Sequence, residues 1–313
     1  MELAAKFVPA ADEVWFLQHR DAPECRFFRG FSEEGHYGGR NEPTNTRQGL
    51  YCCTPGGAFL ASVNHNDPRR VARMLKDALA RWEEVAEEAR YLPEAPDPAA
   101  GRGARGEARF PAGGLALRVY TRDLPREDAP KDWRAGAWNQ DAAWVHPREI
   151  AGLVPALEPG ASREVPADLV RRIARCPLVA NVFGQTLAYR DDEIREAALT
   201  ATVEKVEGGR AWIRFEGRVR AEAEGRWAMR GLRREVKDMT RGYDARLRGW
   251  GVFVPGEGRF AELSMVAVGD RWGGTQYNVR DDDLGPAPMG VAFVLAADDA
   301  PRIAPAHLHS YGW

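Results

Sequence analysis

Most of the features that would point directly to a function are missing from this sequence. Its 44 basic and 46 acidic residues nearly cancel, which argues against a nucleic-acid-binding protein whose affinity depends on a basic face. No stretch of 18 consecutive apolar residues occurs, so we expect no membrane partner. The amino terminus lacks a basic region followed by an apolar one, and we therefore expect a cytoplasmic protein.

Cysteine and lysine are also scarce. The chain has four cysteines, too few for a disulfide scaffold in 313 residues. Nearly all of its positive charge is arginine, and this bias, together with many alanines and prolines, is typical of a GC-rich bacterial coding sequence. The abundance of arginine is therefore no evidence by itself for recognition of a ligand by arginine.

The strongest catalytic motifs are absent as well. The chain contains no GxxxxGK[ST], no HExxH and no paired CxxC, which removes the clearest signals for a nucleotide-binding loop, a metalloprotease and a zinc ribbon. Whether the protein is an enzyme therefore stays open at this level.

The patterns that are present predict an α+β protein with two domains. Residues 92–114 lose all apolar periodicity and are crowded with proline, glycine and alanine, so we expect a linker between a domain at 1–91 and a larger one at 115–313. Apolar and charged residues alternate along 211–223. This alternation predicts that the larger domain is mainly an antiparallel sheet with one solvated face.

The first 91 residues predict a smaller α/β domain. Its expected elements are a buried strand at 14–18, a helix that opens at Pro23, a hairpin of 50–54 and 58–63, and an amphipathic helix at 67–90.

This order of elements resembles the thioredoxin fold over residues 12–90. In that family a Cys-x-x-Cys pair opens the helix after the first core strand, and Ala22-Pro23-Glu24-Cys25 lies at the matching place here. Only the second cysteine of the pair is present. Thr54-Pro55 lies where the family has its proline before the hairpin. The resemblance implies a degenerate thioredoxin-like scaffold without dithiol exchange, whereas the rest of the chain resembles no family that we can name.

Cys25 is the candidate catalytic residue. At a helix amino terminus, backbone N–H groups and the helix dipole stabilise a thiolate. Such a thiol could attack an electrophile, form a mixed disulfide or bind a soft metal such as Cu(I) or Hg(II), although a small buried cysteine would fit the same position. The leading hypothesis from the sequence is a thiol-based module that binds a soft metal or performs one-thiol redox chemistry through Cys25.

Two histidines near the carboxyl terminus are further candidate metal ligands. His307 and His309 are two residues apart, and on an extended strand both imidazoles would lie on one face, a spacing that Zn or Cu can use. A third ligand from His36, His65 or a carboxylate would be required. Cys25, His307 and His309 are therefore the predicted metal-binding residues, and copper or zinc the predicted metals.

The alternative hypothesis is a non-catalytic protein that binds a small or polymeric ligand. Residues 270–283 form the most unusual polar and aromatic run of the chain. Glycines beside Trp272 and Tyr277 would let a ligand approach the backbone, and Arg271 or Asp281 could hold its polar groups. A loop whose aromatic residues close the end of a sheet would have the same composition.

Overall fold

The chain forms two compact units. The computed structural model describes residues 2–36, 46–94, 105–228 and 236–312, and the units are Met1–Ala108 and Arg109–Trp313. The border between them falls within the segment 92–114, of which residues 95–104 lie outside the described residues. In the described part of the chain, no helix is long and apolar enough to cross a membrane.

The smaller unit combines helices with a two-stranded antiparallel sheet. Its elements are α1 (Val14–His19), α2 (Pro23–Ser32), β1 (Leu50–Cys53), β2 (Phe59–Val63), α3 (Pro68–Glu84) and α4 (Glu87–Arg90). The side chain of Asp67 accepts hydrogen bonds from the N–H groups of Arg69 and Arg70, which is why α3 begins where the sequence predicts. Met74 and Ala78 of α3 pack in one cluster with residues of the hairpin.

The strand predicted at 14–18 is wrong, because this segment is the helix α1. The carboxylate of Glu13 accepts a hydrogen bond from the N–H of Phe16, 2.5 Å away, so a side chain caps the first turn. A run of only four apolar residues fits a helix as well as a strand. The helix predicted at 67–90 also divides, since α3 ends at Glu84 and α4 follows. The resemblance to the thioredoxin fold stays a prediction.

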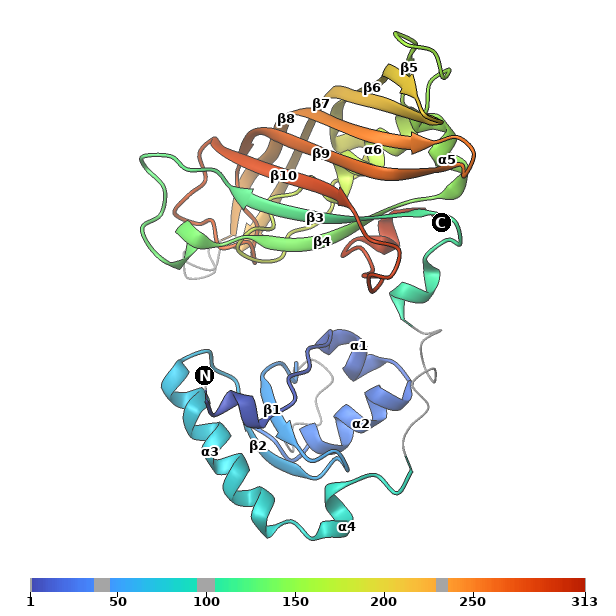
Figure 1. Cartoon of the computed structure of the whole chain (residues 1–313). Coiled ribbons are helices and arrows are strands. Elements are labelled where there is room, and N and C mark those ends of the chain that lie inside the picture. Colours follow the sequence, from blue (N-terminus) through green and yellow to red (C-terminus); the bar gives the residue numbers. More distant parts are fainter. Residues whose placement is uncertain (1, 37–45, 95–104, 229–235, 313) are drawn as a thin grey trace. The chain divides into compact units, whose positions relative to one another are not determined.

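The larger unit is built on one curved eight-stranded sheet (Figure 1). Its strands are β3 (Leu115–Asp123), β4 (Asn139–Val145), β5 (Ser162–Glu164), β6 (Ile194–Glu207), β7 (Arg210–Ala228), β8 (Val236–Val254), β9 (Arg259–Trp272) and β10 (Ala287–Leu295). They lie in the order β4-β3-β10-β9-β8-β7-β6-β5, and every neighbouring pair is antiparallel. The predicted α+β class with a mainly antiparallel sheet is confirmed at this level.

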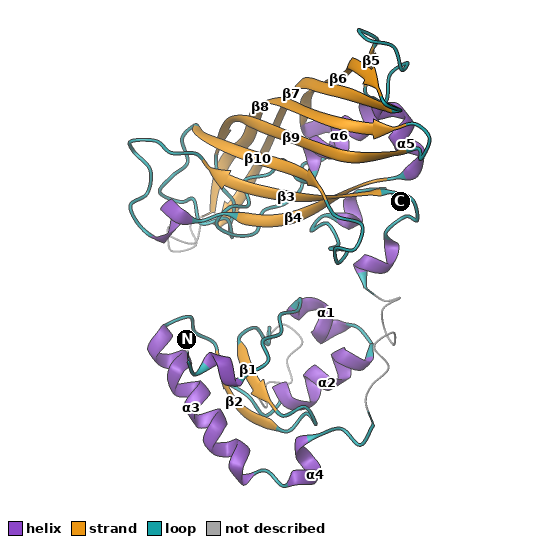
Figure 2. Ribbon diagram, viewed as in Figure 1, coloured by secondary structure: helices purple, strands orange, loops and turns teal. Residues whose placement is uncertain are grey.

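Alternation along the strands separates a buried face from a solvated one, as predicted. Phe215 of β7 is 2% exposed, whereas the side chain of its neighbour Arg214 is 42% exposed and forms ion pairs with Glu204 and Glu216. Side chains from the buried face pack in one cluster with the apolar side of α6 (Ala167–Arg175). The short helix α5 (Pro147–Ile150) precedes α6 along the chain, and Figure 2 shows both helices beside the sheet.

Candidate functional site

Two long connections leave the sheet of the larger unit at the same end of its strands. Strand β10 lies between β3 and β9. Its residue Met289 pairs with Asp123 at the end of β3, and Ala287 pairs with Arg271 near the end of β9. The β3–β4 connection (124–138) and the β9–β10 connection (273–286) therefore begin side by side, although about 150 residues of sequence separate them.

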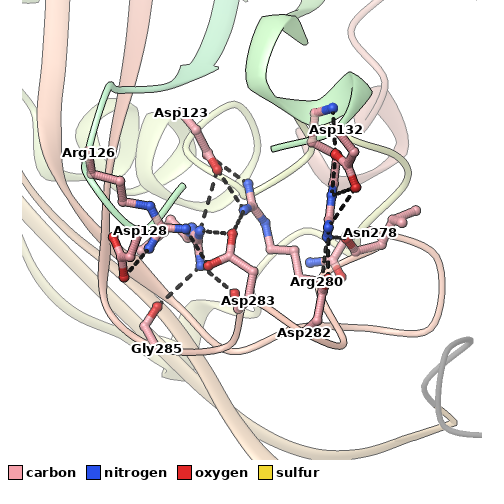
Figure 3. Close-up of polar contacts among 12 residues, drawn as sticks. Asp123, Arg126, Asp128, Asp132, Asn278, Arg280, Asp282, Asp283 and Gly285 are labelled. Atoms are coloured by element: carbon pink, nitrogen blue, oxygen red, sulfur yellow. Dashed lines mark hydrogen bonds and ion pairs between the residues drawn. The ribbon is translucent and has the colours of Figure 1, made fainter. Parts of the chain in front are cut away.

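A cluster of buried charged side chains joins these two connections (Figure 3). Arg271 and Arg280 are both fully buried. The guanidinium of Arg280 donates two hydrogen bonds of 2.8 Å to the two carboxylate oxygens of Asp123. Arg271 donates to the carboxylate of Asp283 and, over 2.6 Å, to its backbone carbonyl. Each buried cation thus has a carboxylate partner, as a buried charge requires.

Arg271 and Arg280 also favour the ionised form of Asp123. Burial raises the pKa of this carboxyl group, but hydrogen bonds and attraction from Arg280 and Arg271 outweigh burial and hold the pKa below its ordinary value. The pKa of Asp123 is lower in the folded protein than in the unfolded protein, where it is about 4. The ionised carboxylate therefore makes its full contribution to stability when the pH is above that unfolded value. This contribution is lost as the pH falls from there through the lowered pKa.

Two more arginines lie in an outer layer of the cluster. Arg126 forms ion pairs with Asp283 and with Asp128, the latter at 3.5 Å. Arg134 is 8% exposed and pairs with Asp132 and with Asp282. Four guanidinium groups and two carboxylates of the cluster have side chains less than one-fifth exposed, namely Arg126, Arg134, Arg271, Arg280, Asp123 and Asp283. The buried part of the cluster therefore carries an excess of positive charge.

Phe183, from the segment after α6, packs against this cluster. The guanidinium of Arg280 lies 4.4 Å from the centre of its ring and that of Arg134 lies 5.9 Å away, distances at which a cation is attracted to an aromatic face. Its neighbour Gly184 approaches the backbone so closely that a Cβ atom there would lie 2.1 Å from the carbonyl oxygen of Tyr277. Only glycine fits this contact, which holds the segment of Phe183 against the β9–β10 connection.

The β9–β10 connection contains a strained residue. Val279 has φ of 52°, a left-handed conformation that is unfavourable for a β-branched side chain. The side chain of Asn278 accepts a hydrogen bond from the N–H of Thr275, and Arg134 donates to the carbonyl of Val279. These contacts maintain the strained backbone next to Arg280, and strain of this kind is concentrated at functional sites.

A cleft of about 200 Å³ opens beside the cluster. Among the described residues its polar lining consists of Arg122, Asp123, Arg126 and Arg134. Its apolar lining consists of Phe183, Leu124, two prolines and two alanines. A concave site with apolar walls and a few convergent charged groups is the usual form of a small-molecule site.

The three arginines of the cleft differ in how many of their N–H groups are already used. All five N–H groups of Arg134 donate hydrogen bonds within the protein. Within the described residues, the side chain of Arg126 donates one hydrogen bond, to Asp283, and the side chain of Arg122 has neither a hydrogen bond nor an ion pair. Arg122 and Arg126 therefore have N–H groups available to a ligand in the cleft.

The residues predicted for a ligand site are distributed unevenly around this cleft. Arg271 lies in the buried cluster behind it, so its side chain serves the cluster and does not line the cleft. Trp272 is the last residue of β9, and Tyr277 and Asp281 belong to the connection that follows it. None of the three is among the described residues that line the cleft. Tyr277 is 60% exposed, and its role as a ligand platform stays a prediction.

A second, wider groove of about 400 Å³ lies on the solvated face of the sheet. It contains Trp250, Arg248 and Arg214 with Glu204 and Glu216. Surface ion pairs already satisfy Arg214. The side chain of Arg248 also has no partner among the described residues, so the two sites differ in their surroundings: buried charges lie beside the cleft, whereas the groove lies on the exposed face of the sheet. The cleft beside the cluster is therefore the stronger candidate.

Cys25 is placed where the sequence predicts but is not accessible. It is the third residue of α2, which begins at Pro23, so it does lie in the first turn of a helix. Its side chain is fully buried, however, and its thiol lies 3.5 Å from the backbone carbonyl of Phe16 in α1. Because α1 covers this thiol, an electrophile would reach it only after local opening of the smaller unit.

We expect Cys53 to be alkylated before Cys25 in the folded protein. Cys53 is partly exposed, whereas Cys25, Cys52 and Cys176 are buried. Burial raises the pKa of Cys53 above its ordinary value, so the reaction should be slow at pH 7 and faster at pH 9. Mass mapping of iodoacetamide-labelled peptides measures the order, with the protein in guanidinium chloride as the fully reactive control. Labelling of Cys25 first would restore the thiol hypothesis.

The two histidines near the carboxyl terminus do not lie on a strand, so that expectation is corrected. His307 immediately precedes a single helical turn, Leu308–Ser310, and the two imidazole centres are 6.1 Å apart. The turn forms because Leu308 packs with Trp144 in an apolar cluster. Burial, helped by the neighbouring His309, lowers the pKa of His307 to about 4.

No set of metal ligands accompanies these histidines. Within the described ranges, no group of three or more His, Cys, Asp or Glu side chains is placed to hold a metal ion. Of the other proposed ligands, His36 lies 2.8 Å from the hydroxyl of Ser62, and His65 accepts the N–H of Asp67. Cys25 belongs to the smaller unit. The prediction of copper or zinc at Cys25, His307 and His309 has no structural support.

Sequence reasoning missed Asp123, Arg126, Arg134 and Phe183. One signal was present, since Arg122 and Asp123 follow directly on the apolar strand 115–121, and charged residues at strand ends are frequent in binding sites. Nothing in the sequence around Phe183 distinguishes it from a core residue.

Comparisons with models of known protein families, with curated proteins and with solved structures found no match.

Proposed function

We propose that the larger unit is a non-catalytic binding module that holds a small anionic molecule in the cleft between the β3–β4 and β9–β10 connections. The observation that supports this most is Arg122, which lines the cleft and has no partner within the described residues. Beside it, Arg126 donates one hydrogen bond, to Asp283, and its longer ion pair with Asp128, at 3.5 Å, is not a hydrogen bond, so further N–H groups are available. Guanidinium groups bind carboxylate and phosphate oxygens through paired hydrogen bonds.

The rest of the lining favours binding over catalysis. Its single carboxylate, Asp123, is held by two arginines, and a carboxylate with a lowered pKa is a weak base. Among the described lining residues there is no serine, cysteine, histidine or lysine. The chemistry available at the cleft is charge recognition on a rigid frame, because the cluster of ion pairs behind it leaves little freedom to move.

We expect anions to bind to the full-length protein and to change its tryptophan fluorescence. Trp133 is largely exposed and its ring centre lies 5.8 Å from that of Phe183, so Trp133 should report on occupancy of the cleft. Titration with acetate, benzoate, phosphate and sulfate tests this, and Trp133→Phe should remove the signal. Binding should weaken as NaCl is added, because salt screens exposed charges.

Arg122→Gln is the variant that tests this proposal. It should weaken anion binding by about tenfold or more, since a hydrogen bond to a charged group contributes about 1.5–3 kcal/mol. The matched control is Arg246→Gln, the same change at an exposed arginine of β8 outside the cleft. The proposal is wrong if no anion of the panel binds, or if both variants bind as the unaltered protein does.

A further inference from the structure

We infer that the ligand of this cleft is a compact apolar monocarboxylate of about the size of benzoate. This inference rests on the proposed function and adds the chemical class of the ligand. Three features of the described residues lead to it: the arrangement of free donors, the composition of the walls and the volume.

The free donors favour an anionic group that accepts hydrogen bonds from two arginines. Arg122 has no partner within the described residues, and Arg126 donates only to Asp283 there. A carboxylate has two oxygens and about four lone-pair directions, so it can accept paired hydrogen bonds from one guanidinium and a further one from the second. Arg134 has no N–H left to donate, and its part is to support the wall formed by Phe183.

The apolar walls of the cleft favour a ligand that has an apolar body as well as an anionic group. Leu124, Phe183 and four small residues, Pro125, Ala129, Pro130 and Ala135, make up most of the lining. Inorganic phosphate or sulfate would meet the arginines but would leave this apolar surface in contact with water. A ligand with an apolar body covers it and gains from its removal from water.

The volume limits the size of that body. A protein cavity of about 150 Å³ accommodates benzene, a molecule of six non-hydrogen atoms. By the same proportion, a cleft of about 200 Å³ accommodates roughly eight non-hydrogen atoms. Benzoate, with one more, is close to this size, and so are branched aliphatic carboxylates with a similarly short body. For a ligand this small we expect a dissociation constant between about 10 µM and 1 mM.

Isothermal titration calorimetry with four probes separates the contributions of charge and body. Benzoate has both, benzamide has the body without the charge, and acetate and inorganic phosphate have the charge without the body. We expect benzoate to bind at least tenfold more tightly than each of the other three. Arg122→Gln and Arg126→Gln should both weaken benzoate binding by about tenfold, whereas Arg246→Gln should leave it unchanged.

A second variant tests the volume. Ala135→Leu places a larger side chain in the cleft wall and should weaken benzoate binding while leaving the weak binding of acetate intact. Ala135 is exposed, so this change should not unfold the unit, and thermal unfolding of each variant verifies that.

The outcomes distinguish this inference from the proposed function. If acetate or phosphate binds as tightly as benzoate and Arg122→Gln weakens that binding, the inference of an apolar body is wrong and the anion-binding module stands. If benzamide matches benzoate, or if none of the four probes binds, both are wrong. Preference for benzoate with loss in both arginine variants supports both.

Discussion

Phe215→Asp is expected to unfold the larger unit. Phe215 lies on the buried face of β7, is 2% exposed and packs with its ring centre 6.4 Å from that of Phe260. Loss of a buried phenylalanine side chain costs about 3–5 kcal/mol, and an unpaired carboxylate in the same place costs several kcal/mol more. The total approaches the whole stability of an ordinary domain, about 5–15 kcal/mol. Near-ultraviolet circular dichroism during heating measures the loss.

The control for this prediction is one residue away. Arg214→Asp changes a side chain on the solvated face, where ion pairs with Glu204 and Glu216 contribute about 0–1 kcal/mol each. We expect a loss of about 1–2 kcal/mol, which includes repulsion between the new aspartate and the two glutamates. Equal melting temperatures for the two variants would contradict the alternation of faces along β7.

Asp283→Asn is expected to destabilise the larger unit by about 3–5 kcal/mol, the usual cost of breaking a buried ion pair. The carboxylate of Asp283 accepts hydrogen bonds from Arg126, Arg271 and Arg280. Asparagine keeps the shape of the side chain and removes its charge, so among the described residues Arg271 and Arg280 would retain only the carboxylate of Asp123 as an ion-pair partner. For a unit of this length the loss corresponds to a fall in melting temperature of roughly 10 °C.

The same substitution two residues earlier is the matched control. Asp281 belongs to the same connection but has no ion pair or hydrogen bond within the described residues. Asp281→Asn should therefore change the melting temperature by no more than a degree or two, because an unpaired surface charge contributes little. If Asp283→Asn is as mild as Asp281→Asn, the buried cluster does not stabilise the fold and the frame of the cleft is not rigid.

The structure bears differently on the thiol hypothesis and on the binding hypothesis. The thiol hypothesis correctly placed Cys25 in the first turn of a helix, but the position of α1 over that turn buries the side chain. The binding hypothesis named Arg271 within the run 270–283, and Arg271, Arg280 and Asp283 of that run take part in the buried cluster beside the cleft. The aromatic residues that it named, Trp272 and Tyr277, do not line this cleft, and their role as a ligand platform stays a prediction.

Local elements were predictable where short-range physics decides them. Asp67 and Pro68 mark the start of α3, because a capping carboxylate and a proline at the first helical position act within one turn. Strict alternation marked β7, because a strand directs successive side chains to opposite faces. The strand predicted at 14–18 was wrong because its four apolar residues, Val14 to Leu17, are too few to show a period, and the cap from Glu13 favours a helix.

The candidate site depended on tertiary structure. The sequence by itself determined that long amphipathic strands would form one sheet with a buried face, and that charged residues would occupy the connections. It did not determine that β10 lies between β3 and β9, because alternation recurs in several strands and contains no information on which strands are neighbours. That order brings Asp123 to Arg280, 157 residues later in the chain. This pair links the end of β3 to the β9–β10 connection beside the cleft that Arg122 and Arg126 line. The sequence could not show it, because proximity in space decides the partners of buried charges.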